Sequence, residues 1–83
     1  MKVTLKLFAS LREALGTSVE VIDTEARTLL GLRSELMARG PLWTEQLAPS
    51  RNVRMAIDQV MVRGDAALHE AAEVAFFPPV TGG

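Results

Sequence analysis

The chain has 83 residues, a formal net charge of −1 and a hydrophobic fraction of 48%, which together predict one folded domain. The basic residues are scattered, which argues against a nucleic-acid partner, and no apolar run reaches the roughly 20 residues of a membrane-spanning helix. The absence of cysteine excludes disulfides, thiolate catalysis and cysteine-ligated metal sites, and the lack of an N-terminal apolar stretch predicts a cytoplasmic protein.

Residues 2–8 alternate between polar and apolar side chains, the pattern of a half-buried strand. The alternation places Phe8 on the face opposite Val3, Leu5 and Leu7. A large apolar side chain on the outer face of a small domain is typical of an interface, so Phe8 is a candidate contact residue.

A short helix and a second strand follow. Ser10 and Glu13 have the spacing of a capping box, which predicts that a helix begins at this point. Gly16 is suited to end it in the left-handed conformation. The β-branched residues within 19–22 predict the second strand.

The main helix is predicted to begin at Thr28, whose hydroxyl can cap the first turn. Leucines recur at helical spacing over 29–36, and Arg33 lies largely off that apolar face. Gly40 and Pro41 are expected to end the helix, with Gly40 as a left-handed cap.

The second half of the chain predicts three more strands, after an irregular stretch with at most one helical turn. Five strands and one long helix pack most simply as an α+β domain, with the helix on one face of a mixed sheet. The irregular stretch covers 42–52, the strands cover 53–57, 60–62 and 73–77, and turns are predicted at 58–59 and 64–65.

Few residues suit catalysis. His69 is the only histidine, which excludes a histidine cluster and a histidine-based triad, and we interpret it as a solvated loop residue. The sequence has no phosphate-binding glycine motif, and its carboxylates are dispersed. We therefore predict that the chain is not a self-contained enzyme and binds no metal or cofactor of its own.

The C-terminal tail is the most informative segment. Pro78 and Pro79 have no N–H to donate, so a sheet ladder must end there, and they favour a stiff extended exit. Six residues over 78–83 can reach at most about 20 Å, and Gly82 and Gly83 add no side chain that would obstruct a narrow channel. The pattern predicts a projecting arm whose terminal carboxylate, on Gly83, is open to attack.

The element order and the terminal Gly-Gly resemble the ubiquitin-like, or β-grasp, sulfur carriers. Within them the chain is similar to the small subunits of molybdopterin synthase. The most specific match covers 73–83, and the residues at 7–9, 11–13 and 56–59 also fit.

This resemblance implies a cycle on Gly83. A separate ATP-dependent activating enzyme adenylates the carboxylate, and a sulfur donor converts the adenylate into a thiocarboxylate. The tail then enters the large subunit of molybdopterin synthase and gives its sulfur to cyclic pyranopterin monophosphate. In the family the complex is a heterotetramer of two large and two small subunits. AMP and sulfur are therefore transient covalent groups, and the chain is a sulfur-donating subunit.

The resemblance also implies where partners bind. The sheet face near the tail is the docking face in the family, which makes Phe8, Met61 and Phe77 candidate interface residues, with Arg12 as a polar addition. The residues expected to thread the partner's channel are Pro78, Pro79, Val80, Thr81 and Gly82.

Two departures from the family pattern and two alternatives remain. Ala71 and Ala72 stand where the family usually has Gly-Asp, so that loop is expected to bend differently or to be less stable, and Asp58 replaces the usual turn Asn.

One alternative is a sulfur carrier for thiamine, tRNA thiolation or cysteine synthesis. The other is a ubiquitin-like modifier or interaction domain without sulfur chemistry.

Overall fold

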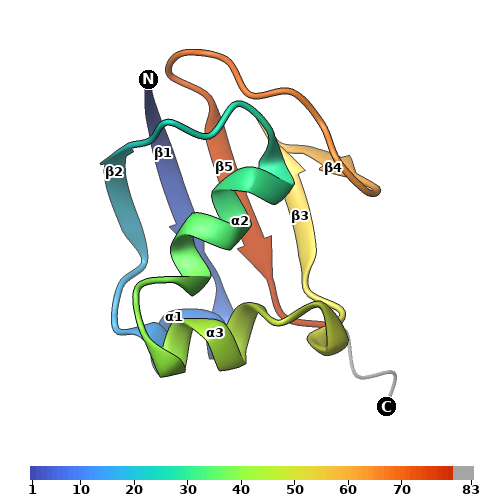
Figure 1. Cartoon of the computed structure of the whole chain (residues 1–83). Coiled ribbons are helices and arrows are strands. Elements are labelled where there is room, and N and C mark those ends of the chain that lie inside the picture. The colour runs from blue at the N-terminus through green and yellow to red at the C-terminus, as the bar shows by residue number, and fades with distance from the viewer. Residues whose placement is uncertain (80–83) are drawn as a thin grey trace.

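A computed structural model describes residues 1–79, which form a five-stranded sheet with helices packed against it (Figure 1). No helix in this part of the chain is long and apolar enough to cross a membrane. The elements in chain order are β1 (Lys2–Leu7), α1 (Ala9–Leu15), β2 (Val19–Asp23), α2 (Leu29–Met37), α3 (Pro41–Leu47), the 3-10 turn η1 (Pro49–Arg51), β3 (Arg54–Ile57), β4 (Val60–Val62) and β5 (Glu73–Phe77).

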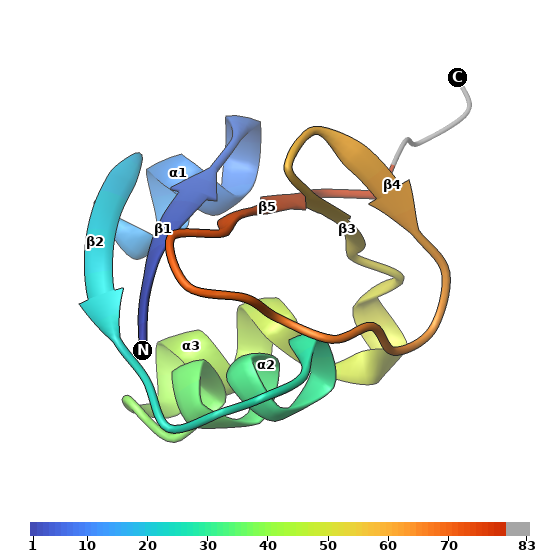
Figure 2. The same ribbon diagram turned by 90° about the horizontal axis from the view of Figure 1, so that it is seen from above.

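The sheet has the strand order β2-β1-β5-β3-β4. The central pair β1 and β5 is parallel, and the other neighbouring pairs are antiparallel. Seen from above, α2 and α3 lie on one side of the curved sheet (Figure 2). The predicted α+β architecture with a mixed five-stranded sheet is therefore confirmed, with α3 as an additional helix.

The core lies between the sheet and α2. In the parallel pair, Leu5 lies beside Val74 and Leu7 beside Phe76, and all four side chains are almost completely buried. The leucines of α2 cover them, as their helical spacing predicts. The most deeply buried helical side chains are Leu11, Leu29, Leu32, Leu36 and Leu47.

Arg33 is buried, so the prediction that it lies off the apolar face is wrong. Its Nε donates to the carbonyl of Leu47 at 2.7 Å, and its Nη2 donates to the carbonyl of Ala48 at 3.0 Å. These carbonyls end α3, where backbone acceptors lack helical partners and a positive charge is favourable. Burial lowers the pKa of Arg33. The residue faces inward because α3, which the sequence pattern does not predict in full, packs beside α2.

Two predicted helix ends are wrong. The helix α1 begins at Ala9 after Phe8, and no side chain caps it, so Ser10 and Glu13 do not form a capping box. The carbonyl of Phe8 instead accepts from the N–H of Leu11 at 3.1 Å. Gly16 does end this helix in the left-handed conformation, as predicted.

The main helix α2 ends earlier than predicted. Its C-cap is Ala38 in a right-handed conformation, and Gly40 is the N-cap of α3, so Gly40 is not a left-handed cap. Thr28 caps the start as predicted, because its hydroxyl oxygen accepts from the N–H of Gly31 at 3.1 Å. Asp65 adds a second acceptor, for the N–H of Leu30 at 2.9 Å.

The loop before β5 contains a strained alanine. Ala71 has φ +66°, a left-handed conformation that is unfavourable for residues with a Cβ, while Ala72 is completely buried. The loop therefore keeps a glycine-like bend at Ala71 without a glycine there.

We predict that Ala71→Gly raises the free energy of unfolding by about 1 kcal/mol, because it removes the Cβ clash of the left-handed conformation. Chemical denaturation monitored by circular dichroism measures the change. Ala72→Gly is the matched control, and it should destabilise the protein because it removes a buried methyl group. A destabilised Ala71→Gly variant would contradict the strain.

Candidate functional site at the root of the C-terminal tail

The tail leaves the middle of the sheet. Its strand β5 lies between β1 and β3 and ends at Phe77, at the same edge as α1 and α3 (Figure 1). Pro78 is half-buried and Pro79 is exposed, and neither belongs to a strand. The residues predicted to enter a partner beyond them, Val80 to Gly83, lie outside the described residues. The structure thus places the root of the tail at a central, well-supported position.

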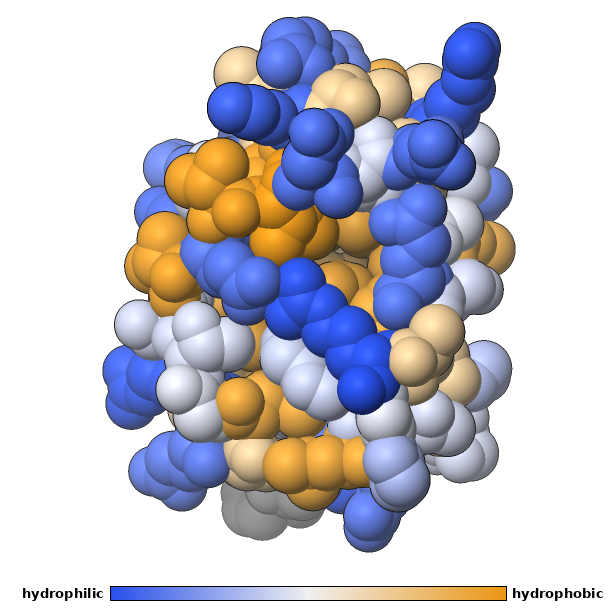
Figure 3. Space-filling view, turned by 60° about the vertical axis from the view of Figure 1, so that its left-hand side comes forward, coloured by the Kyte–Doolittle hydropathy of each residue, from blue (hydrophilic) through white to orange (hydrophobic). Residues whose placement is uncertain are grey.

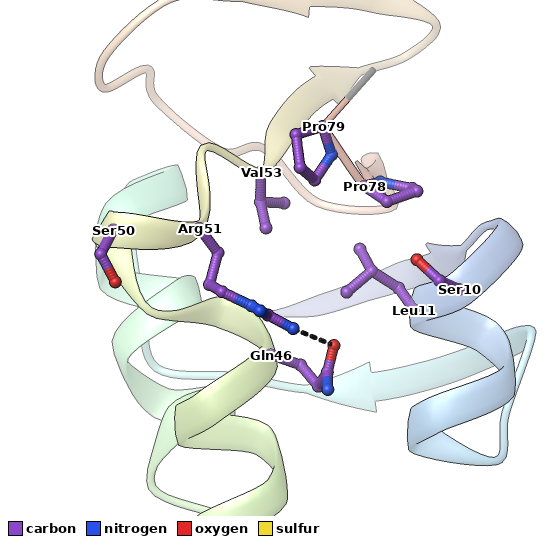
Figure 4. A pocket seen from close by; sticks show the side chains of 8 residues that line it. All are labelled: Ser10, Leu11, Gln46, Ser50, Arg51, Val53, Pro78 and Pro79. Carbon is purple, nitrogen blue, oxygen red and sulfur yellow. Dashed lines mark hydrogen bonds between the residues drawn. The ribbon is translucent and has the colours of Figure 1, made fainter. Parts of the chain in front are cut away.

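An open depression of about 320 Å³ lies beside this root (Figure 4). Its walls come from α1, α3, η1 and the two prolines, and among the described residues that line it Arg51 alone is charged. The Nη2 of Arg51 donates to Oε1 of Gln46 at 3.3 Å across the depression. The lining residues are Ser10, Leu11, Gln46, Ser50, Arg51, Val53, Pro78 and Pro79.

Hydroxyl and amide groups line this depression beside the root of the tail. Among residues 1–79 its lining includes no carboxylate, histidine or lysine. Sequence analysis missed it because three segments far apart in the chain form it. The single useful signal was the Pro-Pro pair.

Two predicted interface residues are in contact. The rings of Phe8 and Phe77 stack with centroids 4.7 Å apart and an interplanar angle of 7°. The backbone of Phe8 is held in place, because its N–H donates to the carbonyl of Phe76 at 3.3 Å, while the residue remains 39% exposed. The pair forms an apolar surface next to the first residue of the tail.

The other two predicted interface residues lie apart from this stack. Met61 is 54% exposed on the open face of the sheet, and the register places it beside Ala56, which lies beside Ala75. Arg12 is exposed on α1. The structure therefore joins Phe8 to Phe77 and leaves Met61 on the same face two strands away.

Exposed apolar side chains also occur away from the tail. The edge strand β2 exposes Val19 and Val21, and its side of the molecule carries apolar patches separated by hydrophilic side chains (Figure 3). Arg39 contributes to the polar part of this edge through two hydrogen bonds to Glu20, at 3.1 and 2.9 Å. Exposure alone therefore does not single out the tail root, whereas the stacked aromatic pair does.

The one paired histidine lies at the other end of β5. The Nε2 of His69 is 2.5 Å from Oδ2 of Asp58, and its Nδ1 is 2.9 Å from the carbonyl of Glu70. Asp58 also accepts from the N–H of Glu73 at 3.0 Å. His69 is exposed, as predicted, but it is not merely solvated, because it ties the β3–β4 turn to the next loop.

These contacts shift both pKa values. The hydrogen bond to Asp58, followed by that to the Glu70 carbonyl, raises the pKa of His69. The backbone N–H of Glu73, followed by His69, lowers the pKa of Asp58. Within residues 1–79 no group of three His, Asp or Glu side chains could hold a metal ion.

Sequence comparison finds relatives along nearly the whole chain. Residues 5–83 match the ThiS family. The molybdopterin synthase sulfur carrier subunit of Escherichia coli (strain K12) is 35% identical over 81 residues, which cover 98% of this chain and 99% of that protein. The protein of the same name from Haemophilus influenzae is 33% identical over 76 residues, which cover 92% of this chain and 93% of that protein.

Solved structures share the fold. Small archaeal modifier protein 1 from Haloferax volcanii superposes with a TM-score of 0.79 at 21% identity, over 96% of this chain and 99% of that one. A chain in the complex of subunits 1 and 2 of the molybdopterin-converting factor from Helicobacter pylori superposes with a TM-score of 0.70 at 20% identity, over 100% of both. The predicted β-grasp fold is confirmed.

We predict that the His69–Asp58 contact stabilises the fold most between about pH 4 and pH 6.5, where His69 is protonated and Asp58 is ionised. Because folding raises the pKa of His69, its contribution is complete below the pKa that this histidine has in the unfolded chain, and it is lost as the pH rises through the pKa in the folded protein. A lowered aspartate pKa contributes stability that is lost as the pH falls through its folded value.

His69→Gln keeps a hydrogen-bonding side chain but cannot become charged. Its melting temperature should fall further below that of the wild type at about pH 5.5 than at about pH 8.5. Calorimetry at both pH values measures the difference. If His69→Gln lowers the melting temperature equally at both pH values, the charge on His69 does not stabilise the fold.

Proposed function

The chain belongs to the ThiS family, and we propose that it is the sulfur-carrier subunit of a molybdopterin synthase. The relative from Escherichia coli with that name matches this chain almost from end to end, which supports the assignment. The observation that carries the proposal is the tail root, where β5 ends at Phe77 beside an exposed aromatic stack. This arrangement suits a domain that presents its tail to another protein.

The reactive group in this proposal is the terminal carboxylate of Gly83. It attacks the α-phosphorus of ATP in an activating enzyme, pyrophosphate leaves, and a glycyl adenylate forms. A carboxylate oxygen is a poor leaving group, whereas AMP is a good one. A sulfur donor then replaces AMP, and the tail carries a thiocarboxylate, which is a better nucleophile than the carboxylate.

The chain itself supplies position rather than acid–base catalysis. The depression at the tail root has no proton-transferring group, and the His69–Asp58 pair lies at the opposite end of β5. Partner enzymes therefore provide the acid–base and phosphate-binding groups. The contribution of this chain is to bring the sulfur atom to them in a fixed orientation.

The main partner is the large subunit, within which the thiocarboxylate of Gly83 donates its sulfur to cyclic pyranopterin monophosphate. The Helicobacter pylori complex of subunits 1 and 2, in which one chain has this fold, supports such a pairing. We assign the docking surface to the open sheet face with Phe8, Phe77 and Met61, bordered by Arg12. The ATP-dependent activating enzyme uses the same face, and the tail enters each partner in turn.

We predict that Phe8→Ala weakens binding of the large subunit about tenfold or more, because aromatic side chains at the centre of an interface contribute most to binding. Isothermal titration calorimetry with the purified large subunit measures the affinity. Leu42→Ala is the control, since Leu42 is 46% exposed on α3, away from the open sheet face. Equal losses in both variants would contradict the assigned docking surface.

We also predict that incubation with the activating enzyme, ATP and a sulfur donor replaces one oxygen of Gly83 by sulfur. Intact-mass spectrometry should show a gain equal to the difference between the two atoms. Deleting Gly83 should abolish the gain, whereas Ala71→Gly, far from the tail, should preserve it. No gain in a system that converts a known carrier would refute the sulfur chemistry and favour a modifier or interaction domain.

The pathway is tested separately by reconstitution. The thiocarboxylated chain should support molybdopterin formation with the large subunit and should fail with a thiazole synthase. The opposite result would keep the sulfur carrier but assign it to thiamine synthesis.

A further inference from the structure

Two arginines lie at adjoining ends of neighbouring strands, because Arg54 is the first residue of β3 and Arg63 directly follows β4. Arg54 pairs with Phe77 and therefore lies on the same face as the aromatic stack. The last paired residues of β3 and β4 are Met55 and Val62, so the next step of the register brings Arg54 opposite Arg63. Both arginines are exposed. Like charges directly opposite each other on a sheet are destabilising, so this pair works against the fold.

Neither arginine is neutralised within the described part of the chain. Among residues 1–79 two cationic side chains do have carboxylate partners: Lys6 lies 3.3 Å from Glu73, and Arg39 lies 2.9 Å from Glu20. No carboxylate lies within 4.0 Å of Arg54 or Arg63 among residues 1–79. The positive charge of the pair is therefore available to another molecule.

The arginines also border a groove. It has a volume of about 480 Å³, and its lining includes Arg54, Arg63 and Met61. Met61 lies on one side of the pair and Phe77 lies beside Arg54, so the charges are continuous with the apolar docking surface. Apolar anchors with charged neighbours at the margin are the usual anatomy of a protein interface.

We propose that Arg54 and Arg63 form a cationic clamp for a carboxylate-bearing segment of the large subunit, at the rim of the channel that receives the tail. This inference rests on the proposed function and names a specificity determinant within it. Two guanidinium forks can each bind a carboxylate through paired hydrogen bonds. A carboxylate bound between the two guanidinium groups would reduce the repulsion between Arg54 and Arg63. Binding would therefore also stabilise the fold at this point.

The position of the arginines favours a role in docking over a role in the chemistry at Gly83, because Arg54 pairs with Phe77, the last strand residue before the tail. A nucleic acid is also disfavoured, because the chain has a net charge of −1 and its basic residues are scattered rather than massed on one face. An acidic protein segment fits the position and the chemistry.

The test is the affinity of the full chain for the purified large subunit with Arg63→Glu. This substitution places a carboxylate opposite Arg54, so thermal unfolding should show a fold at least as stable as the wild type. Binding should nevertheless fall about tenfold or more in about 0.05 M NaCl, and the loss should shrink in about 0.5 M NaCl, where charges are screened. Arg63→Lys keeps the charge and should retain most of the affinity.

Arg27→Glu is the matched control, since it changes the net charge equally at an exposed position beside Asp23 and Glu25, outside the open sheet face. It should leave the affinity nearly unchanged. If wild type binds and Arg63→Glu binds equally well, or if Arg27→Glu loses as much affinity, the clamp is wrong while the proposed function stands. If the wild type does not bind the large subunit, the proposed function fails and the clamp falls with it.

Discussion

The parallel pairing of β1 with β5 is the contact on which the rest of the structure depends. It sets Leu7 beside Phe76 in the layer that α2 covers, so it builds the core. Because parallel strands end at the same edge, Phe8 leaves β1 next to Phe77, where the tail begins. One strand pairing therefore forms both the buried face and the exposed aromatic stack. A shift of its register by one residue would exchange these two faces of β5.

Polar groups at the helix ends are satisfied by residues far away in the chain. Arg33 of α2 donates to the carbonyls that end α3, and Asp65, from the loop after β4, accepts from the first turn of α2. Such contacts prevent buried backbone groups from remaining unpaired, which would cost more than each hydrogen bond contributes. They also hold α3 and η1 in place beside Pro78 and Pro79. The root of the tail is thus fixed by contacts that involve most of the domain.

The two faces of the sheet have different physical roles. The covered face is apolar and closely packed, and it provides the stability of a small domain. The open face has a partly exposed aromatic stack, an exposed methionine and, at the adjoining ends of β3 and β4, two exposed arginines. Such a mixture of apolar and cationic side chains on an open sheet face is consistent with the proposed docking surface.

The sequence by itself determined the strands, the Thr28 cap, the turns at Gly16 and Asp58, and the end of the last strand before the two prolines, because alternation, capping and proline chemistry are local. The same local rules misplaced Arg33 and the start of α1, since the partners that decide those positions lie on other elements. Only the tertiary structure showed that Phe8 stacks on Phe77, that three distant segments support the prolines, and that Arg54 and Arg63 line one groove. Strand order and register create these neighbours, and neither can be read from the periodicity of a single segment.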